Sequence, residues 1–306
     1  MRDSFESKFE ASTTTLKNII DVDRSTALAK CVLEDTVFRS LDAVPSMAFC
    51  VLKHAGASMN GMGEYGTGGE IYRLLPRTTA KNALPLFAKT SMSLRYPVQF
   101  LGVNFMELWK KSGSKSLLAN YREIALADFD GKTLGSHQRR SIFQAVICLA
   151  GRSQIGSGLN TGSTCACNLH VSQAYCLARI RKVACGTLFV DIIGAFSAVN
   201  RRISIPDQPV SEEQWRRHLC ACGYSVADAN ATVAIGLPVA DWTAAGASQH
   251  AIALLSASHA ASWFSIDGIE AVSTFLKGAL AGTSLADIIF VVTMARVLSV
   301  LEVELA

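Results

Sequence analysis

The sequence predicts an α/β fold, with strands and helices interleaved in the α+β manner, behind a helical N-terminal leader. Half of the 306 residues are hydrophobic and 18% are charged, so the chain has ample apolar side chains for a globular core. Long stretches carry apolar residues at helical spacing, whereas residues 188–190 have the pattern of a short buried strand that ends in a carboxylate, Asp191. Helical spacing together with a buried strand is typical of a mixed fold.

Residues 1–95 form the predicted leader, whose role the sequence does not indicate. Ser25 can supply the N-cap of a helix, because apolar residues at helical spacing follow it. A glycine-rich loop is expected at residues 56–69. Pro76 and Pro85 are expected to interrupt the helical pattern that comes after it.

Residues 96–306 are expected to hold the interleaved strands and helices. Helices are predicted at residues 136–149 and from 164 to about 182. The alanine-rich residues 211–262 are also predicted to be mostly helical.

The tail at residues 288–301 is the most hydrophobic stretch of the chain. Arg296 interrupts it, and it is shorter than the ~20 apolar residues that span a bilayer, so a buried or amphipathic helix is predicted. Residues 1–6 carry charges where a signal peptide needs an apolar run. Nine scattered cysteines, an odd number, suit reduced thiols. The sequence therefore predicts an intracellular protein, nuclear or cytoplasmic, that does not use a membrane.

The residues around Asp191 allow two interpretations of its role. A carboxylate at the end of a buried strand must face water, a partner or a cation, because burying it alone is costly. Strand-end carboxylates beside small residues commonly hold Mg²⁺, which prefers oxygen ligands. The alternative is a carboxylate that caps a turn.

The segment around Asp191 reads Leu-Phe-Val-Asp-Ile-Ile-Gly-Ala-Phe-Ser-Ala-Val. It resembles the first catalytic motif of reverse transcriptases, Phe-x-Asp-x-x-x-Ala-Phe-Asp-x-Val, in the version found in non-LTR (LINE-type) retrotransposons. Ser197 stands where the family has the last Asp of this motif.

Three further segments resemble landmarks of the same family and occur in its order. Residues 120–126, followed by Lys132, are similar to the Asn-Tyr-Arg-Pro-Ile-Ser-Leu segment of the fingers, with Glu in place of Pro. Residues 154–164 are similar to Gln-x-Gly-Phe-Arg-x-Gly-x-Ser-Thr. Residues 278–290 are similar to the Gly-x-x-Gln/Pro-Gly-Asp-x-Leu-Ala-Asp-x-x-Phe loop and helix. The resemblance implies the fingers and a partial palm of a right-hand polymerase over residues 96–306.

The resemblance also implies a metal site. In the family, two Mg²⁺ ions on three carboxylates activate the primer hydroxyl and hold the triphosphate. Asp191 matches one of these carboxylates, as catalytic residue and metal ligand, and the backbone carbonyl of Ile192 matches the neighbouring oxygen ligand.

Four more residues are implied to contact the nucleotide. Phe196 would lie under the incoming sugar, and Arg122 and Lys132 would be cations of the fingers near the triphosphate. Gly282 would let the backbone approach the base pair. The alternatives are a core phenylalanine, two solvated surface cations and an ordinary turn glycine.

The second catalytic motif of the family, an aromatic followed by Ala-Asp-Asp, is missing from these 306 residues. The chain has no Asp after Phe290, and one carboxylate should not hold two Mg²⁺ ions against their hydration. We therefore expect a truncated, catalytically incomplete segment of an RNA-directed DNA polymerase, a nucleotidyltransferase whose partners would be an RNA template, a DNA primer and dNTPs.

The alternative functions differ in their charge requirements. A noncatalytic RNA-binding remnant needs basic surface, and the 240 residues before Asp241 hold 27 basic and 19 acidic side chains. The basic residues often occur in pairs, such as Arg139-Arg140 and Arg201-Arg202, although solvated helix faces look the same. An unrelated alanine-rich interaction protein would show no salt-dependent binding of nucleic acid.

Two other motifs are weaker. The Gly-x-Gly-x-x-Gly match at residues 61–66 lacks the acidic ribose partner of a dinucleotide site, so a flexible loop is the preferred interpretation. The Cys and His residues at 165–170 and 218–222 do not have the usual spacing of structural zinc ligands, and buried thiols are the preferred interpretation.

Overall fold

The structure is a computed structural model that describes most of the chain. The described residues are 12–15, 17–19, 43–58, 66–117, 120–151, 154–155, 159, 164–187, 192, 194–206, 212–221, 224–236, 239–275 and 277–305. Residues 188–191, with the strand predicted to end at Asp191, lie outside this part, as does the Ser25 cap.

A five-stranded sheet of mixed orientation has the strand order β1-β5-β4-β2-β3. The strands are β1 (Ser12–Thr14), β2 (Gly102–Trp109), β3 (Tyr121–Ala127), β4 (Trp263–Ile266) and β5 (Ile269–Thr274). β2 runs parallel to β4 and antiparallel to β3, while β5 is antiparallel to both β4 and β1. A mixed sheet combined with many helices confirms the predicted α/β class.

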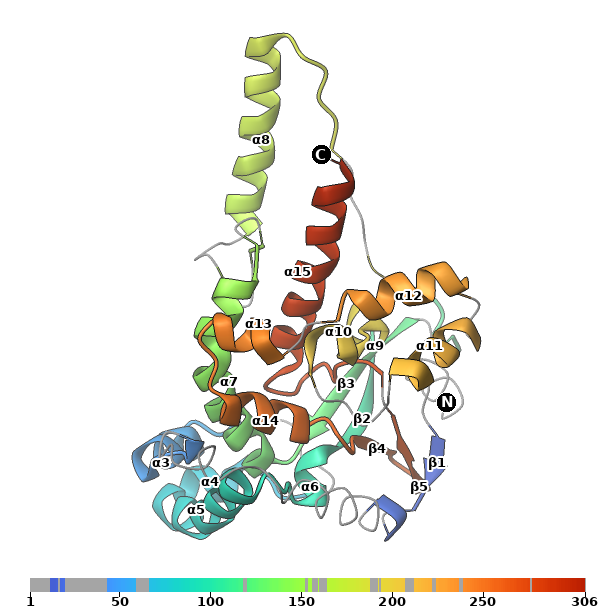
Figure 1. Ribbon diagram of the computed structural model, residues 1–306. Coiled ribbons are helices and arrows are strands. Elements are labelled where there is room, and N and C mark those ends of the chain that lie inside the picture. The colour runs from blue at the N-terminus through green and yellow to red at the C-terminus, as the bar shows by residue number, and fades with distance from the viewer. Residues whose placement is uncertain are drawn as a thin grey trace.

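Helices surround the sheet (Figure 1). They are α3 (Met47–Ala55), α4 (Gly69–Leu74), α5 (Pro76–Ser93), α6 (Val98–Leu101), α7 (Phe129–Leu149), α8 (Thr164–Arg181), α9 (Ala195–Ala198), α10 (Arg201–Ser204), α11 (Glu212–Ala221), α12 (Val226–Ala234), α13 (Val239–Ala244), α14 (Gln249–Ala257) and α15 (Ala286–Leu305). α7 is central to the packing, because it contacts α3, α6, α14 and α15. None of the described helices has the length and apolar content needed to cross a bilayer.

Three of the predicted helical regions are confirmed. α8 matches the helix predicted from residue 164, and α11 to α14 make residues 212–257 mostly helical where they are described. α15 matches the predicted tail helix, and Ile288, Ile289 and Val292 on it are buried in the largest hydrophobic cluster.

The helix predicted at residues 136–149 begins earlier, at Phe129. Gly131 and Gly135 lie in the added turns, and each glycine disfavours a helix by about 1 kcal/mol relative to alanine. Leu134 between them is fully buried, so packing stabilises turns that local propensity does not favour.

The expectation that Pro76 and Pro85 interrupt the helix is half wrong. Pro76 begins α5, a position where the missing N–H costs nothing, but Pro85 lies inside the same helix. Ala80 and Phe87 on either side of Pro85 are fully buried. Burial of this face offsets the helix hydrogen bond that Pro85 removes.

The predicted leader contains a strand as well as helices α3 to α5. β1 pairs with β5 through Ser12 opposite Thr274, near the other end of the chain. Phe87 of α5 also shares a hydrophobic cluster with Leu134 and Trp263. Side chains from both sides of residue 95 therefore pack together.

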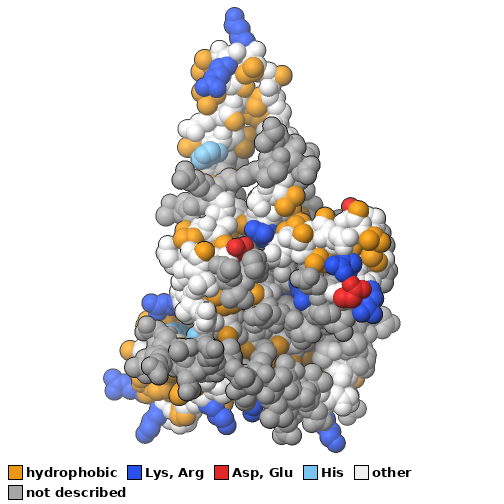
Figure 2. All heavy atoms as spheres, in the orientation of Figure 1, with side chains coloured by type: hydrophobic (Ala, Val, Ile, Leu, Met, Phe, Trp, Pro, Cys, Tyr) orange, Lys and Arg blue, Asp and Glu red, His pale blue; other side chains and the backbone are white. Residues whose placement is uncertain are grey.

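α8 rises away from the sheet (Figure 1). Its side chains are mostly exposed, including the large apolar residues Leu169, Leu177 and Ile180. The space-filling view shows hydrophobic and basic side chains side by side over this projecting part (Figure 2).

Candidate functional site

The loop at residues 278–285, which precedes α15, is held by segments from distant parts of the sequence. The N–H of Gly278 donates to the carbonyl of Val199 at 2.7 Å, and the N–H of Ala279 donates to the carbonyl of Phe196, also at 2.7 Å. These bonds fix the segment that follows Asp191 against the loop. Two of the family-like landmarks therefore lie in direct contact.

The same loop also bonds to β3, which carries the first landmark. The N–H of Ala125 donates to the carbonyl of Ala281 at 2.9 Å. The neighbouring Gly282 has a φ of +106°, and a Cβ at this position would lie 2.5 Å from the carbonyl oxygen of Ala125. Glycine is required here for both its backbone conformation and its close approach to β3.

Lys132 also lies beside this loop, in the first turn of α7. The Ser284 hydroxyl donates to the Lys132 carbonyl at 3.0 Å. The Lys132 side chain is half-buried, and burial lowers the pKa of its ammonium, while the charge of Asp128 opposes this shift. The predicted nucleotide-contacting residues Lys132 and Gly282 are therefore brought together.

The remaining family-like segment, residues 154–164, is bonded to α15, the helix that follows the loop. Gln154 donates from Nε2 to the carbonyl of Val291 at 3.1 Å. Phe196 packs against the main hydrophobic cluster, and its ring centroid lies 5.5 Å from that of Phe290. In this structure Phe196 therefore acts as a partly buried packing residue.

Other predicted site residues are not brought to the loop. Arg122 lies on β3 opposite Leu108, with its side chain exposed. Ile192 is exposed, and Asp191 lies outside the described residues. In the described part of the chain, no three His, Cys, Asp or Glu side chains gather as a metal site. The Mg²⁺ site implied at Asp191 therefore stays a prediction from the resemblance.

Some of the basic pairs noted in the sequence are engaged within the protein. Arg139 donates from Nη2 to the Asp287 carboxylate at 2.5 Å, which ties α7 to α15. Arg216 is paired with Glu213 on α11. Arg201 is buried, with 1% of its surface exposed. Adjacent basic residues thus do not make a single surface for phosphates.

A cavity of about 70 Å³ lies between the loop, the first turns of α7 and the end of α14. Its lining includes two cations, Lys132 and Arg201, and the amide of Gln138. Neither Asp nor Glu occurs among the described residues that line it.

Arg201 holds the walls of this cavity together through neutral acceptors. Its Nε donates to the carbonyl of Gly278 at 2.6 Å, and its Nη1 donates to the carbonyl of His259 and to the hydroxyl of Ser262, both at 3.0 Å. Its guanidinium also lies over the Phe275 ring, 4.6 Å from the centroid. Burial lowers the pKa of Arg201 to about 9, still well above neutral pH.

His259 contributes no charge to the cavity. Burial and the nearby charge of Arg201 lower the pKa of His259 to about 3. Its Nδ1 lies 3.0 Å from the carbonyl of Leu255 and 2.8 Å from the hydroxyl of Ser258.

Sequence reasoning missed Arg201 and Gln138. The Arg201-Arg202 pair is visible in the sequence, but its pattern is that of a solvated helix start. Gln138 is one polar residue in an amphipathic helix, and nothing in its spacing marks it as a cavity residue.

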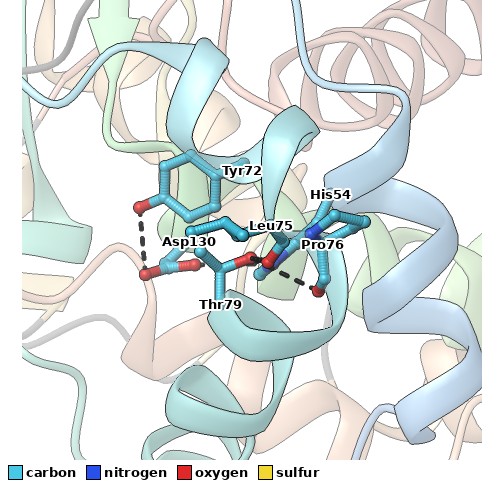
Figure 3. Close-up of polar contacts among 6 residues, drawn as sticks. All are labelled: His54, Tyr72, Leu75, Pro76, Thr79 and Asp130. Carbon is cyan, nitrogen blue, oxygen red and sulfur yellow. Dashed lines mark hydrogen bonds and ion pairs between the residues drawn. The ribbon is translucent and has the colours of Figure 1, made fainter.

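A second polar cluster, shown in Figure 3, joins α3, α4 and α5 to the start of α7. The Nδ1 of buried His54 lies 2.8 Å from the hydroxyl of Thr79, and that hydroxyl donates to the carbonyl of Leu75. His54 Nε2 faces Asp130 Oδ1 at 3.6 Å, and Tyr72 donates to the other carboxylate oxygen at 3.2 Å.

The hydrogen bonds assign the protons of this cluster. Because the single proton of the Thr79 hydroxyl goes to a backbone carbonyl, His54 Nδ1 must donate to Thr79. Neutral His54 then presents a lone pair from Nε2 to the Asp130 carboxylate, so a proton between them is needed for a favourable contact. Burial raises the pKa of Asp130 to about 6, and it lowers the pKa of His54.

No protein-family profile and no curated protein sequence matches the chain.

Proposed function

We propose that this chain is the fingers and partial palm of a reverse transcriptase, an RNA-directed DNA polymerase of the kind found in non-LTR retrotransposons. The support is the resemblance of four ordered segments, combined with the hydrogen bonds around the 278–285 loop. Phe196 and Val199, Ala125 and Lys132 are widely separated in sequence, yet each contributes a carbonyl or N–H to that loop.

In this proposal, Lys132 and the 278–285 loop contact the incoming dNTP and the template. Gly282 keeps the loop close to β3, because a side chain there would collide with the backbone of Ala125. Arg122 is exposed on the edge strand β3 and is available to a phosphate of the nucleic acid.

The proposed chemistry needs three carboxylates, and the sequence matches only Asp191. We therefore propose that these 306 residues do not extend a primer. The test is primer extension on an RNA template with Mg²⁺ and dNTPs, beside an active reverse transcriptase as the positive control. Extension by this chain that disappears in Asp191→Asn would show that it is a working polymerase, contrary to the proposal.

The second candidate function, a noncatalytic RNA-binding remnant, is favoured by a basic surface on the leader. Between residues 71 and 106 the sequence holds five basic residues and no acidic one. Arg77, Lys81 and Lys89 of α5 are exposed. Figure 2 shows Lys and Arg side chains projecting from the region where Figure 1 places α3 to α5. Such a surface suits the phosphate backbone of RNA.

Fluorescence anisotropy with a labelled single-stranded RNA tests this surface across a series of salt concentrations. The double variant Arg77→Ala/Lys81→Ala should weaken binding and reduce the slope of log K against log salt by about 1.4, since each phosphate contact on a single strand contributes about 0.7. The double variant Arg179→Ala/Arg181→Ala on α8 loses the same charge and is the matched control. Equal effects of both variants would indicate non-specific attraction, and absence of RNA binding would favour an interaction protein.

A further inference from the structure

The cavity beside the 278–285 loop has an unbalanced set of polar groups. Arg201 is almost completely buried, and no carboxylate among the described residues forms an ion pair with it. Lys132 lines the same space, with its ammonium partly desolvated. Two cations thus share a cavity whose described lining has no acidic side chain.

Hydrogen-bond donors are also left over in this cavity. Arg201 uses Nε and Nη1 on neutral acceptors, and within the described structure its Nη2 has no bonded partner. Gln138 is 4% exposed, and its Nε2 has no hydrogen-bond partner in the same part of the chain. Buried donors are nearly always satisfied in folded proteins, so the Gln138 amide needs an acceptor that enters the cavity.

We propose that this cavity is a binding site for a small oxyanion of the phosphate class. An oxyanion supplies the two things that the cavity lacks, negative charge and several acceptor oxygens. The planar guanidinium of Arg201 and the amide of Gln138 can each donate to such an ion, and Lys132 adds a point charge.

The size of the cavity limits the ligand. Its volume of about 70 Å³ is several times the ~10–15 Å³ that one buried water needs. Inorganic phosphate is small enough for this volume, whereas the sugar and base of a nucleotide would have to remain outside the cavity. The anion could be free phosphate or one phosphoryl group of a larger molecule, and the experiment separates these sources.

The proposal does not depend on polymerase ancestry. It follows from the charges and donors around the cavity, and it would hold for any protein with this arrangement. Water is the competing occupant, but water carries no charge to balance Arg201, whereas the Lys132 ammonium already has Asp128 nearby.

The test is calorimetric titration of the full chain with sodium phosphate, with sodium chloride at equal ionic strength as the reference. The melting temperature Tm is also measured by thermal unfolding in each of these two salts. Phosphate at ten times its Kd should raise Tm by about 3 °C over chloride. No phosphate-specific heat and no shift in Tm would overturn the proposal.

Gln138→Glu is the most informative variant, because it is nearly isosteric and places a carboxylate beside the two cations. It should raise Tm in the absence of phosphate and weaken phosphate binding at least about tenfold, through loss of a charge-assisted hydrogen bond and added repulsion. Gln99→Glu makes the same change at an exposed position and should alter neither quantity. Unchanged phosphate affinity in Gln138→Glu would overturn the proposal.

A parallel titration with dATP separates this site from the proposed polymerase function. Binding of dATP but not of phosphate, with no response to Gln138→Glu, would refute the anion site and leave the polymerase proposal standing. Phosphate binding that responds to Gln138→Glu, without any binding of dATP or RNA, would support the anion site while the polymerase proposal fails. If dATP and phosphate compete and both respond to the variant, the site takes a phosphoryl group from either source.

Discussion

The two buried polar clusters of this protein lie against the same turn of α7, yet they differ in kind. Asp130 belongs to the cluster with His54, and Lys132 belongs to the cavity with Arg201. Two residues along a helix correspond to a rotation of about 200°, so the two side chains leave α7 on nearly opposite sides. The first turn of α7 therefore contributes a side chain to each cluster.

The His54 cluster pairs a basic group with an acidic one inside the protein, since His54 Nε2 faces Asp130 Oδ1. His54 bonds to Thr79 and Tyr72 bonds to Asp130, while His54 Nε2 and Asp130 Oδ1 lie 3.6 Å apart, too far for a hydrogen bond but close enough for one proton to offset their repulsion. The Arg201 cavity has donors and positive charge but no anion in its described lining. A buried cluster that balances itself holds the structure together, whereas one that lacks an acceptor indicates a ligand.

The largest expected effect is on stability when Arg201 is removed. Arg201→Met should cost about 4 kcal/mol of unfolding free energy, because the carbonyls of Gly278 and His259 lose their donor in a buried place. Urea denaturation of wild type and variant measures this change in unfolding free energy. The exposed Arg217→Met should change stability by about 0.5 kcal/mol or less. A small effect of Arg201→Met would mean that the cavity walls do not depend on it.

The next largest effect is on stability when Gly282 is changed in the 278–285 loop, which lines the cavity. Gly282→Ala should cost about 3 kcal/mol, from its positive φ and from the contact with the Ala125 carbonyl. Gly246 has a similar φ of +96°, but no atom lies within 4 Å of the place that a Cβ would take, so Gly246→Ala should cost only about 1 kcal/mol. Thermal or urea unfolding of both variants separates backbone strain from close approach. Equal costs would contradict the tight fit of the loop against β3.

The His54 cluster should show coupling of moderate size. His54→Phe keeps the ring against Tyr72 and Phe129, while Asp130→Ala removes the carboxylate. In a double-mutant cycle measured by urea denaturation, the coupling free energy should be about 1–2 kcal/mol. A coupling near zero would mean that the two groups do not share a proton.

The pH dependence of that cluster is an expected effect of similar size. Burial raises the pKa of Asp130 from 3.8 to about 6, so protonated Asp130 stabilises the fold below about pH 4, and this contribution is lost as pH rises through 6. Wild type should therefore lose about 2 kcal/mol relative to Asp130→Asn between pH 4 and pH 7, since Asn mimics the protonated acid.

Urea denaturation of both proteins at several pH values measures this difference. The His54 pKa is shifted the other way, so its contribution is present above pH 6.5 and falls as pH decreases. Both proteins keep His54 and the other titratable groups around Asp130, which are Asp128, Tyr72 and Cys50. Their contributions largely cancel in the comparison, and a flat difference would contradict the raised pKa of Asp130.

The sequence by itself determined the mixed fold class and several helices. The spacing of apolar residues predicted α8, the alanine-rich helices and α15, because each helix is encoded by the face that it buries. It also contains the family-like segments, but their contacts at the 278–285 loop come from the tertiary structure.

Only the tertiary structure decided which polar groups meet. His54 and Asp130 come from different helices, and Arg201 is buried although its sequence context is that of a surface cation. The extra turns of α7 and the helix through Pro85 also depend on packing, which outweighs local propensity there. Local patterns record which face of an element is apolar, but the partners across a core are set by how the elements pack.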